Sequence, residues 1–125
     1  MAPLRSSVDI AAPPDVVWNL ISRYEHWSAW GVSITAVEPS SGRVRAGATG
    51  RVRTLVGVWL PFEITEVAEG ESWSWKVAGV SATGHRVDPT AGGCRVTFSA
   101  PGWAPFYLPV LAWSLQRLAR QSSEV

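Results

Sequence analysis

The chain has few of the residues on which most metal and cofactor sites depend. Its 125 residues include one cysteine, Cys94, two histidines, His26 and His85, and one lysine, Lys76. One cysteine excludes an internal disulfide, and two histidines 59 positions apart do not have the spacing of a zinc site. A glycine-rich phosphate loop followed by lysine and a serine nucleophile elbow are missing as well. We therefore expect neither a metal nor a cofactor.

An excess of charge and a long apolar run are also missing. The 11 basic residues nearly balance the 10 acidic ones, so the chain lacks the electrostatic footprint of nucleic-acid binding. The longest nearly uncharged run, residues 101–116, contains three prolines and is shorter than the roughly 18 residues that a membrane-spanning helix needs. Residues 1–10 lack the apolar core of a signal peptide. We expect a cytoplasmic protein with no nucleic-acid partner and no membrane span.

Tryptophan, by contrast, is abundant. The chain has eight tryptophans against two tyrosines and three phenylalanines. Trp73 and Trp75 share one face of any extended segment, because successive side chains of a strand point to opposite sides. So many indoles either fill a large core or line a site for a flat apolar molecule. For any single tryptophan, core packing is the simpler interpretation.

The spacing of apolar residues predicts a mixed α and β domain of ordinary size. A strand is expected over residues 6–12, followed by a helix over 13–27 that begins with two prolines and Asp15. Residues 26–31 suggest one more helical turn, with Trp27 and Trp30 on a common face. Six further strands are expected over residues 34–38, 50–56, 59–67, 72–78, 81–88 and 94–99. Their links are too brief for crossover helices, which predicts an antiparallel meander.

The chain closes with a segment that predicts a long helix, residues 103–121. Leu111, Leu115 and Leu118 form its apolar stripe. Pro109 interrupts the segment, so we expect either a kink or a late start of the helix.

The order of these segments and their amino-acid sequences resemble those of a known superfamily. The resemblance is carried by 8-VDIAAPPDVVWNLI-21, 47-GATGRVRT-54, 61-PFEITEVAEGESWSWKV-77 and 92-GGCRVTF-98. Together they are similar to the START-type helix-grip superfamily, which includes the polyketide cyclase/dehydrase-like (SRPBCC) proteins. The resemblance implies an α+β helix-grip fold over residues 1–125, in which a curved antiparallel β-sheet wraps around a long C-terminal helix and encloses an apolar cavity.

That fold would turn the concave face of the sheet toward the cavity. Arg86 and Asp88 belong on the outer face, so the alternation of the same strand puts His85 and Thr83 inside and Ala82 outside. The residues expected to line the cavity and bind a ligand are Trp30, Val52, Thr54, Phe62, Ile64, Trp73, Trp75, Thr83, His85, Phe98, Tyr107 and Leu111.

His85 is the one strongly titratable residue among them. It is either a buried, neutral, hydrogen-bonded histidine or a group that orients a ligand or moves a proton. We therefore weigh three hypotheses. The favoured one is a protein that binds a hydrophobic, aromatic or polyene-like small molecule, because the expected cavity has few polar groups. The second is a polyketide cyclase/dehydratase-type enzyme with His85 as its catalytic acid or base. The third is a homodimeric interaction protein that pairs through Trp103, Phe106 and Trp113.

Overall fold

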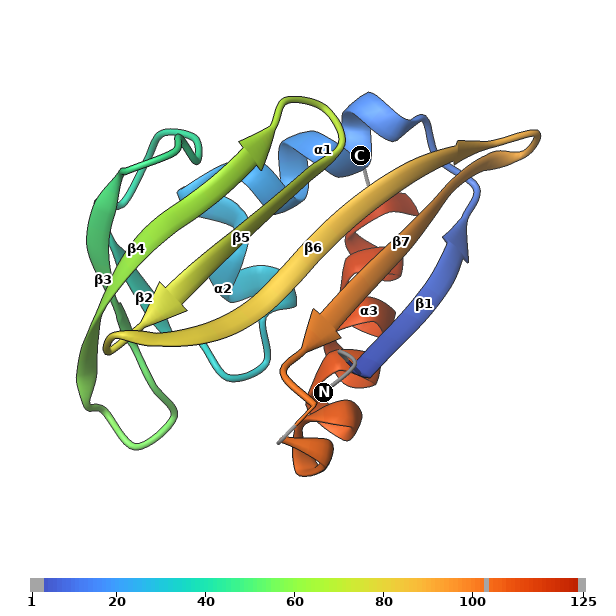
Figure 1. The fold of residues 1–125 in the computed structure, drawn as a ribbon. Coiled ribbons are helices and arrows are strands. Elements are labelled where there is room, and N and C mark those ends of the chain that lie inside the picture. The colour runs from blue at the N-terminus through green and yellow to red at the C-terminus, as the bar shows by residue number, and fades with distance from the viewer. Residues whose placement is uncertain (1–3, 103, 124–125) are drawn as a thin grey trace.

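The computed structural model describes residues 4–102 and 104–123, with the side chain of Phe106 left out. The elements in chain order are β1 (Leu4–Ile10), α1 (Pro14–Ser22), the 3-10 turn η1 (Tyr24–His26), α2 (Trp27–Trp30), β2 (Ala36–Glu38), β3 (Thr49–Arg53), β4 (Trp59–Ala68), β5 (Ser72–Val77), β6 (Val80–Thr90), β7 (Gly93–Ala100), the 3-10 turn η2 (Pro105–Tyr107) and α3 (Leu108–Ser123). The seven strands form one sheet, and the helices lie on one side of it (Figure 1).

The sheet is antiparallel throughout and runs in the order β1-β7-β6-β5-β4-β3-β2. Strands β2 to β7 are thus a meander, and β1 pairs with β7 at the far edge. The curved sheet faces α3, the long C-terminal helix (Figure 1). The prediction of an α+β helix-grip fold is confirmed.

Helix α3 begins at Leu108. Pro109 therefore lies in its first turn, where the missing backbone N–H costs no hydrogen bond. The late start, rather than a kink, is how the helix accommodates this proline. Leu111, Leu115 and Leu118 are buried, so the predicted stripe is the face that packs on the sheet.

The register of the sheet is irregular on both sides of Trp75. Between β4 and β5 the pairing shifts after Ile64, and between β5 and β6 it shifts after Ser74. Each shift leaves one extra residue opposite Trp75, as in a β-bulge, and bulges bend a strand and increase its twist.

The bulge in β6 explains where the predicted alternation holds and where it fails. Regular pairing with β7 resumes at Gly84 and continues to Thr90, so His85 stays on the inner face. The extra residue lies before Gly84, between residues 81 and 84. Ala82 consequently packs against the core, and its assignment to the outer face is wrong.

The expected strand over residues 50–56 ends early. It stops at Arg53, and the chain then turns, with Thr54 N–H donating to the carbonyl of Val58 over 2.9 Å. Gly57 has a φ of +85° in this turn, a conformation that favours glycine. Val56, which continued the apolar alternation in the sequence, is 84% exposed.

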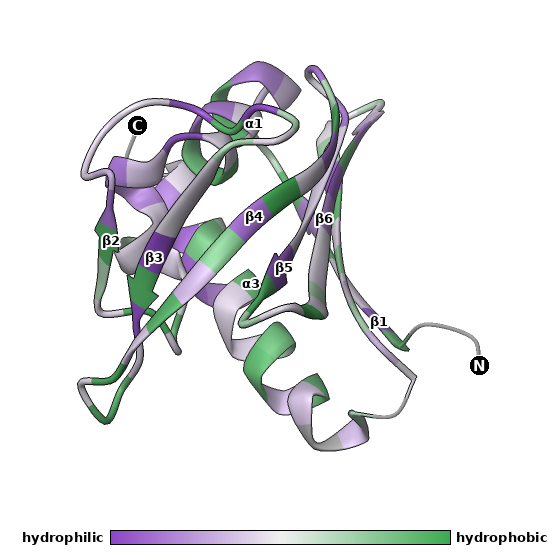
Figure 2. Ribbon diagram, turned by 60° about the vertical axis from the view of Figure 1, so that its left-hand side comes forward, coloured by the Kyte–Doolittle hydropathy of each residue, from purple (hydrophilic) through white to green (hydrophobic). Residues whose placement is uncertain are grey.

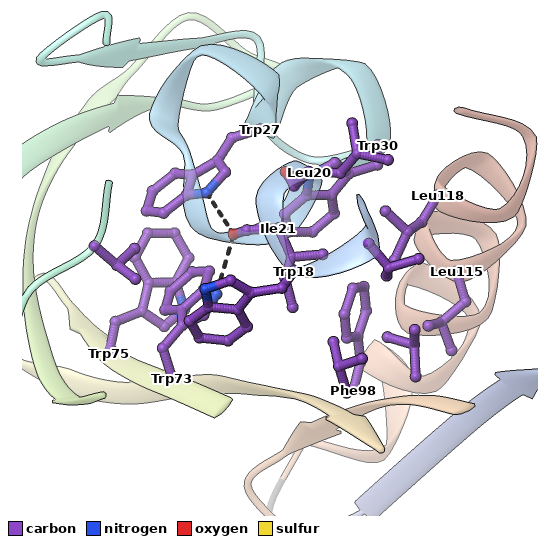
Figure 3. Packing of buried hydrophobic residues seen from close by; sticks show 14 of the residues in the cluster. Trp18, Leu20, Ile21, Trp27, Trp30, Trp73, Trp75, Phe98, Leu115 and Leu118 are labelled. Carbon is purple, nitrogen blue, oxygen red and sulfur yellow. Dashed lines mark hydrogen bonds between the residues drawn. The ribbon is translucent and has the colours of Figure 1, made fainter. Parts of the chain in front are cut away.

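Three indoles bind the carbonyl oxygens at the C-terminal end of α1. Trp27 and Trp73 both donate from Nε1 to the carbonyl oxygen of Ile21, over 2.9 and 3.0 Å (Figure 3). Trp30 donates in the same way to Leu20 over 2.9 Å. The last carbonyls of a helix lack intrahelical partners and form the negative end of its dipole. The indole N–H groups supply the missing hydrogen-bond donors and place positive partial charge at the negative end of the dipole. Phenylalanine, which has no N–H group, could do neither.

This arrangement predicts that the tryptophan N–H matters for stability as well as the ring. Trp30→Phe keeps much of the buried ring but removes the donor to Leu20, so the free energy of unfolding should fall by about 1–3 kcal/mol. Urea denaturation measures the change. Trp113→Phe is the matched control, because Trp113 is 59% exposed, and it should change stability by less than about 0.5 kcal/mol. Equal effects of the two substitutions would contradict the role of the N–H group.

Candidate functional site

A cavity of about 300 Å³ lies between the concave face of the sheet, α2 and the beginning of α3. Its volume is at the lower end of the range of small-molecule sites, about 300–1,000 Å³. Tryptophan rings form much of its wall, and among the described residues no Asp, Glu, Lys or Arg lines it. We call this space the main cavity.

Most of the residues predicted to line a cavity meet here. Those that line the main cavity are Trp30, Val52, Thr54, Trp73, Trp75, Thr83, His85, Phe98, Tyr107 and Leu111. Phe62 and Ile64 are buried on the same face but do not reach it. Phe62 packs against the rings of Trp27 and Trp75, with centroids 5.6 and 5.5 Å away. Aromatic rings thus lie against Phe62, which alternation alone assigned to the cavity.

The main cavity also has wall residues that were not among the predicted ones, namely Trp27, Ile34 and Leu60. Trp27 had a signal in its shared face with Trp30, and Leu60 had one in its alternation with Phe62 and Ile64 along the expected strand over 59–67. Leu55 and Val56 line the opening, where they are 71% and 84% exposed. They belong to the turn between β3 and β4, whose tip is hydrophobic in Figure 2. An exposed turn gives no sequence signal for a cavity mouth.

His85 is held by two hydrogen bonds that fix its tautomer. Its Nδ1 lies 3.3 Å from the carbonyl oxygen of Trp73, an acceptor, so Nδ1 carries the proton and donates. Its Nε2 must then accept, and Thr83 Oγ1 donates to it over 3.0 Å. Thr83 in turn accepts from Trp75 Nε1 over 3.0 Å. The result is a directed chain of hydrogen bonds from Trp75 through Thr83 and His85 to the backbone of Trp73.

Burial keeps His85 neutral. Its ring stacks on Trp73 with centroids 3.9 Å apart and meets the edges of Trp30 and Phe98 at 5.9 and 5.0 Å. This removal from water lowers the pKa of His85 from 6.5 to about 3, although the hydrogen bond to the Trp73 carbonyl acts in the opposite direction. The imidazole therefore remains uncharged at neutral pH, with both nitrogens engaged.

The other polar groups of the main cavity are hydroxyls. Ser114 Oγ accepts from the backbone N–H of Val32 over 3.3 Å, and Ser33 Oγ lies 3.3 Å from the hydroxyl of Tyr107. Thr54 Oγ1 is different, because it is buried and has no hydrogen-bond partner in the structure. A buried hydroxyl without a partner is unusual and costly, so Thr54 has unused hydrogen-bonding capacity in the wall of this cavity.

Within residues 4–102 and 104–123, no group of three Asp, Glu, His or Cys side chains is arranged to hold a metal ion. The helices in this part of the chain are all too short or too polar to cross a membrane. Of the aromatic residues considered for a dimer contact, Trp113 is exposed, whereas Trp103 and the side chain of Phe106 lie outside the described part.

The neutral His85 predicts a specific pH dependence of stability. The unfolded chain takes up a proton on this histidine near pH 6.5, whereas the folded protein does not until about pH 3. The free energy of unfolding should therefore be undiminished above pH 6.5 and fall below it by about 1.4 kcal/mol per pH unit on this account. His85→Gln should remove that part of the slope in urea titrations at several pH values.

His26 provides the matched control for this experiment. It is partly exposed on η1, outside the main cavity, so His26→Gln should keep the acid slope of the unchanged protein. If the slope were the same in all three proteins, His85 could not be a buried neutral group.

Comparison with known proteins places this geometry in context. A family model described as "Polyketide cyclase / dehydrase and lipid transport" matches residues 1–124. Uncharacterized proteins of Mycobacterium tuberculosis and Mycobacterium bovis are 27% identical over 104 residues, which are 76% of this chain. The chain spans 62% of the length of these relatives.

Several solved structures share the fold. Bacillus cereus XoxI has a TM-score of 0.76 at 14% identity, covering 99% of this chain and 97% of that one. Bacillus halodurans BH1534 has a TM-score of 0.74 at 15% identity, covering 98% and 97%. DynU16, a protein of the dynemicin biosynthetic locus, has a TM-score of 0.69 at 22% identity, covering 94% of this chain and 46% of that one.

Proposed function

The chain belongs to the polyketide cyclase / dehydrase and lipid transport family, and on that premise we propose that its main cavity binds an uncharged, hydrophobic small molecule with a flat unsaturated ring system. The observation that carries the proposal is the aromatic, uncharged lining of the main cavity. Trp27, Trp30, Trp73 and Phe98 present aromatic surface to a space that no described charged side chain lines. Removal of a flat apolar molecule from water into such a space is favourable.

Binding without reaction is the function that the polar groups favour. A cyclase or dehydratase that used His85 would need it to exchange a proton near neutral pH. A pKa of about 3 and two occupied ring nitrogens argue against that use. His85 instead supports the wall, because its hydrogen bonds fix Thr83 and the indole of Trp75 in place.

A flat, uncharged probe tests this function directly. 2-Naphthol should quench the tryptophan emission in a saturable manner, with a Kd of about 1–100 µM, or roughly −8 to −5.5 kcal/mol. Leu111→Trp puts an indole into the main cavity from α3 and should weaken binding at least tenfold. Fluorescence titration measures both affinities, and circular dichroism confirms that the variant is folded.

Ala112 offers a control on the same helix. It is exposed and does not line the main cavity, so Ala112→Trp should bind 2-naphthol like the unchanged protein. The proposal fails if quenching is not saturable, or if a folded Leu111→Trp variant binds as tightly as the Ala112→Trp control.

The unpartnered hydroxyl of Thr54 predicts a preference for ligands that carry one hydrogen-bonding group. Thr54→Val keeps the shape of the side chain but removes the oxygen. The affinity for 2-naphthol should fall by about two- to tenfold, which corresponds to one net hydrogen bond of about 0.5–1.5 kcal/mol. The affinity for naphthalene, which lacks the hydroxyl, should not fall. A parallel loss for both compounds would show that the threonine contributes only by packing.

A further inference from the structure

A second hollow lies beside the main cavity. This side pocket has a volume of about 330 Å³ and is formed by the beginning of β6, the end of β7 and the segment that leads into η2. It shares four wall residues with the main cavity, namely Trp75, Val77, Thr83 and Tyr107. The two spaces are therefore neighbours on either side of these side chains.

The two spaces have walls of different character. Aromatic rings dominate the main cavity, whereas Ala82, Ala100 and Ala104 line the side pocket together with aliphatic Val77 and Val80. Flat rings favour a flat ligand group, and small aliphatic side chains leave room for a thin aliphatic one. As in the main cavity, no described charged residue lines the side pocket.

The β6 bulge shapes one wall of the side pocket. Because of the extra residue between Ser81 and Gly84, Ala82 and Thr83 both line the side pocket. In a regular strand these neighbours would point to opposite faces. A methyl group thus stands where regular alternation would have put no side chain, and the junction with the main cavity lies directly beside it.

The junction itself suits a hydrocarbon. Thr83 Oγ1 already donates to His85 and accepts from Trp75, so its proton is engaged. The Trp75–Thr83 bond also fixes the Trp75 ring at the boundary between the two spaces, where Tyr107 is another shared wall residue. A methylene chain can pass such a place without leaving an engaged donor unsatisfied.

We propose that the main cavity and the side pocket form one bent binding site for an uncharged ligand that combines an unsaturated ring with an aliphatic chain. The ring lies in the main cavity, and the chain passes the Trp75–Tyr107 junction into the side pocket. This inference rests on the proposed function, since it names the chemical class of the ligand that the same site binds.

A series of 4-alkylphenols tests the inference. Affinities of 4-ethyl-, 4-butyl- and 4-hexylphenol are measured by quenching of tryptophan emission, with 2-naphthol as the probe of the main cavity alone. Each methylene that enters the side pocket should tighten binding roughly fourfold, the ratio that corresponds to about 0.8 kcal/mol. The ratio of the hexyl to the ethyl affinity is the quantity to compare among variants.

Two variants fill the side pocket, and a control on α3 leaves it open. Ala82→Phe and Ala104→Leu should each reduce the hexyl-to-ethyl ratio to below about threefold, with the affinity for 2-naphthol within about twofold of the unchanged protein. Ala112→Phe lies on the exposed side of α3 and should keep the ratio. Val56→Ser tests the mouth of the main cavity as the other exit for the chain: because Val56 lines that cavity, the affinities of all the phenols are expected to change together, so the ratio should stay the same.

The outcomes separate the two proposals. If 2-naphthol binds but the alkyl series shows no gain with chain length, the inference is wrong and the proposed function stands. It is also wrong if folded Ala82→Phe or Ala104→Leu keeps the full ratio, or if Val56→Ser abolishes it, because the chain then leaves through the mouth. If neither 2-naphthol nor any alkylphenol binds, the proposed function itself fails.

Discussion

The carbonyl oxygens at the C-terminal end of α1 are the point on which the rest of the structure depends. A helix end buried without partners for its carbonyls would be strongly destabilising. Here the partners are indole N–H groups from α2 and β5, so Trp27, Trp30 and Trp73 connect the first helix to both the second helix and the sheet. The rings that satisfy this requirement are also the rings that wall the main cavity. The same three tryptophans therefore cap the end of α1 and form the wall of the main cavity.

His85 is connected to the same tryptophans. Its ring stacks on Trp73, which α1 already holds, and its hydrogen bonds pass through Thr83 to Trp75. A neutral imidazole can accept from one group and donate to another, so it joins two neighbouring strands without placing a charge in an apolar interior. The cavity that results offers a ligand aromatic surface and a few hydroxyls. A charged molecule would be disfavoured by such a lining, because a buried charge would have no partner there.

Trp75 shows how the sheet itself shapes the site. Bulges in both neighbouring strands meet at this residue, and the resulting bend allows the sheet to curve over the helices. The bulge in β6 also turns Ala82 inward, next to Thr83. At this irregularity Thr83 lines both spaces, whereas Ala82 lines the side pocket alone.

The sequence by itself determined the elements of the fold and the inward position of His85. Apolar alternation, turn residues and the position of Pro109 are local properties of the sequence. The charged Arg86 and Asp88 identified the face of β6 that is exposed to solvent. Only the tertiary structure decided which inward residues reach the cavity. Phe62 and Ile64 follow the right alternation but are buried without reaching the cavity, Phe62 against the rings of Trp27 and Trp75. Ala82 faces inward because of a bulge that the alternation did not indicate. The role of the tryptophans as caps was equally hidden, because a hydrogen bond between Trp73 and Ile21 joins residues 52 positions apart. Packing and register are set by the whole chain, whereas periodicity is read from a few neighbouring residues.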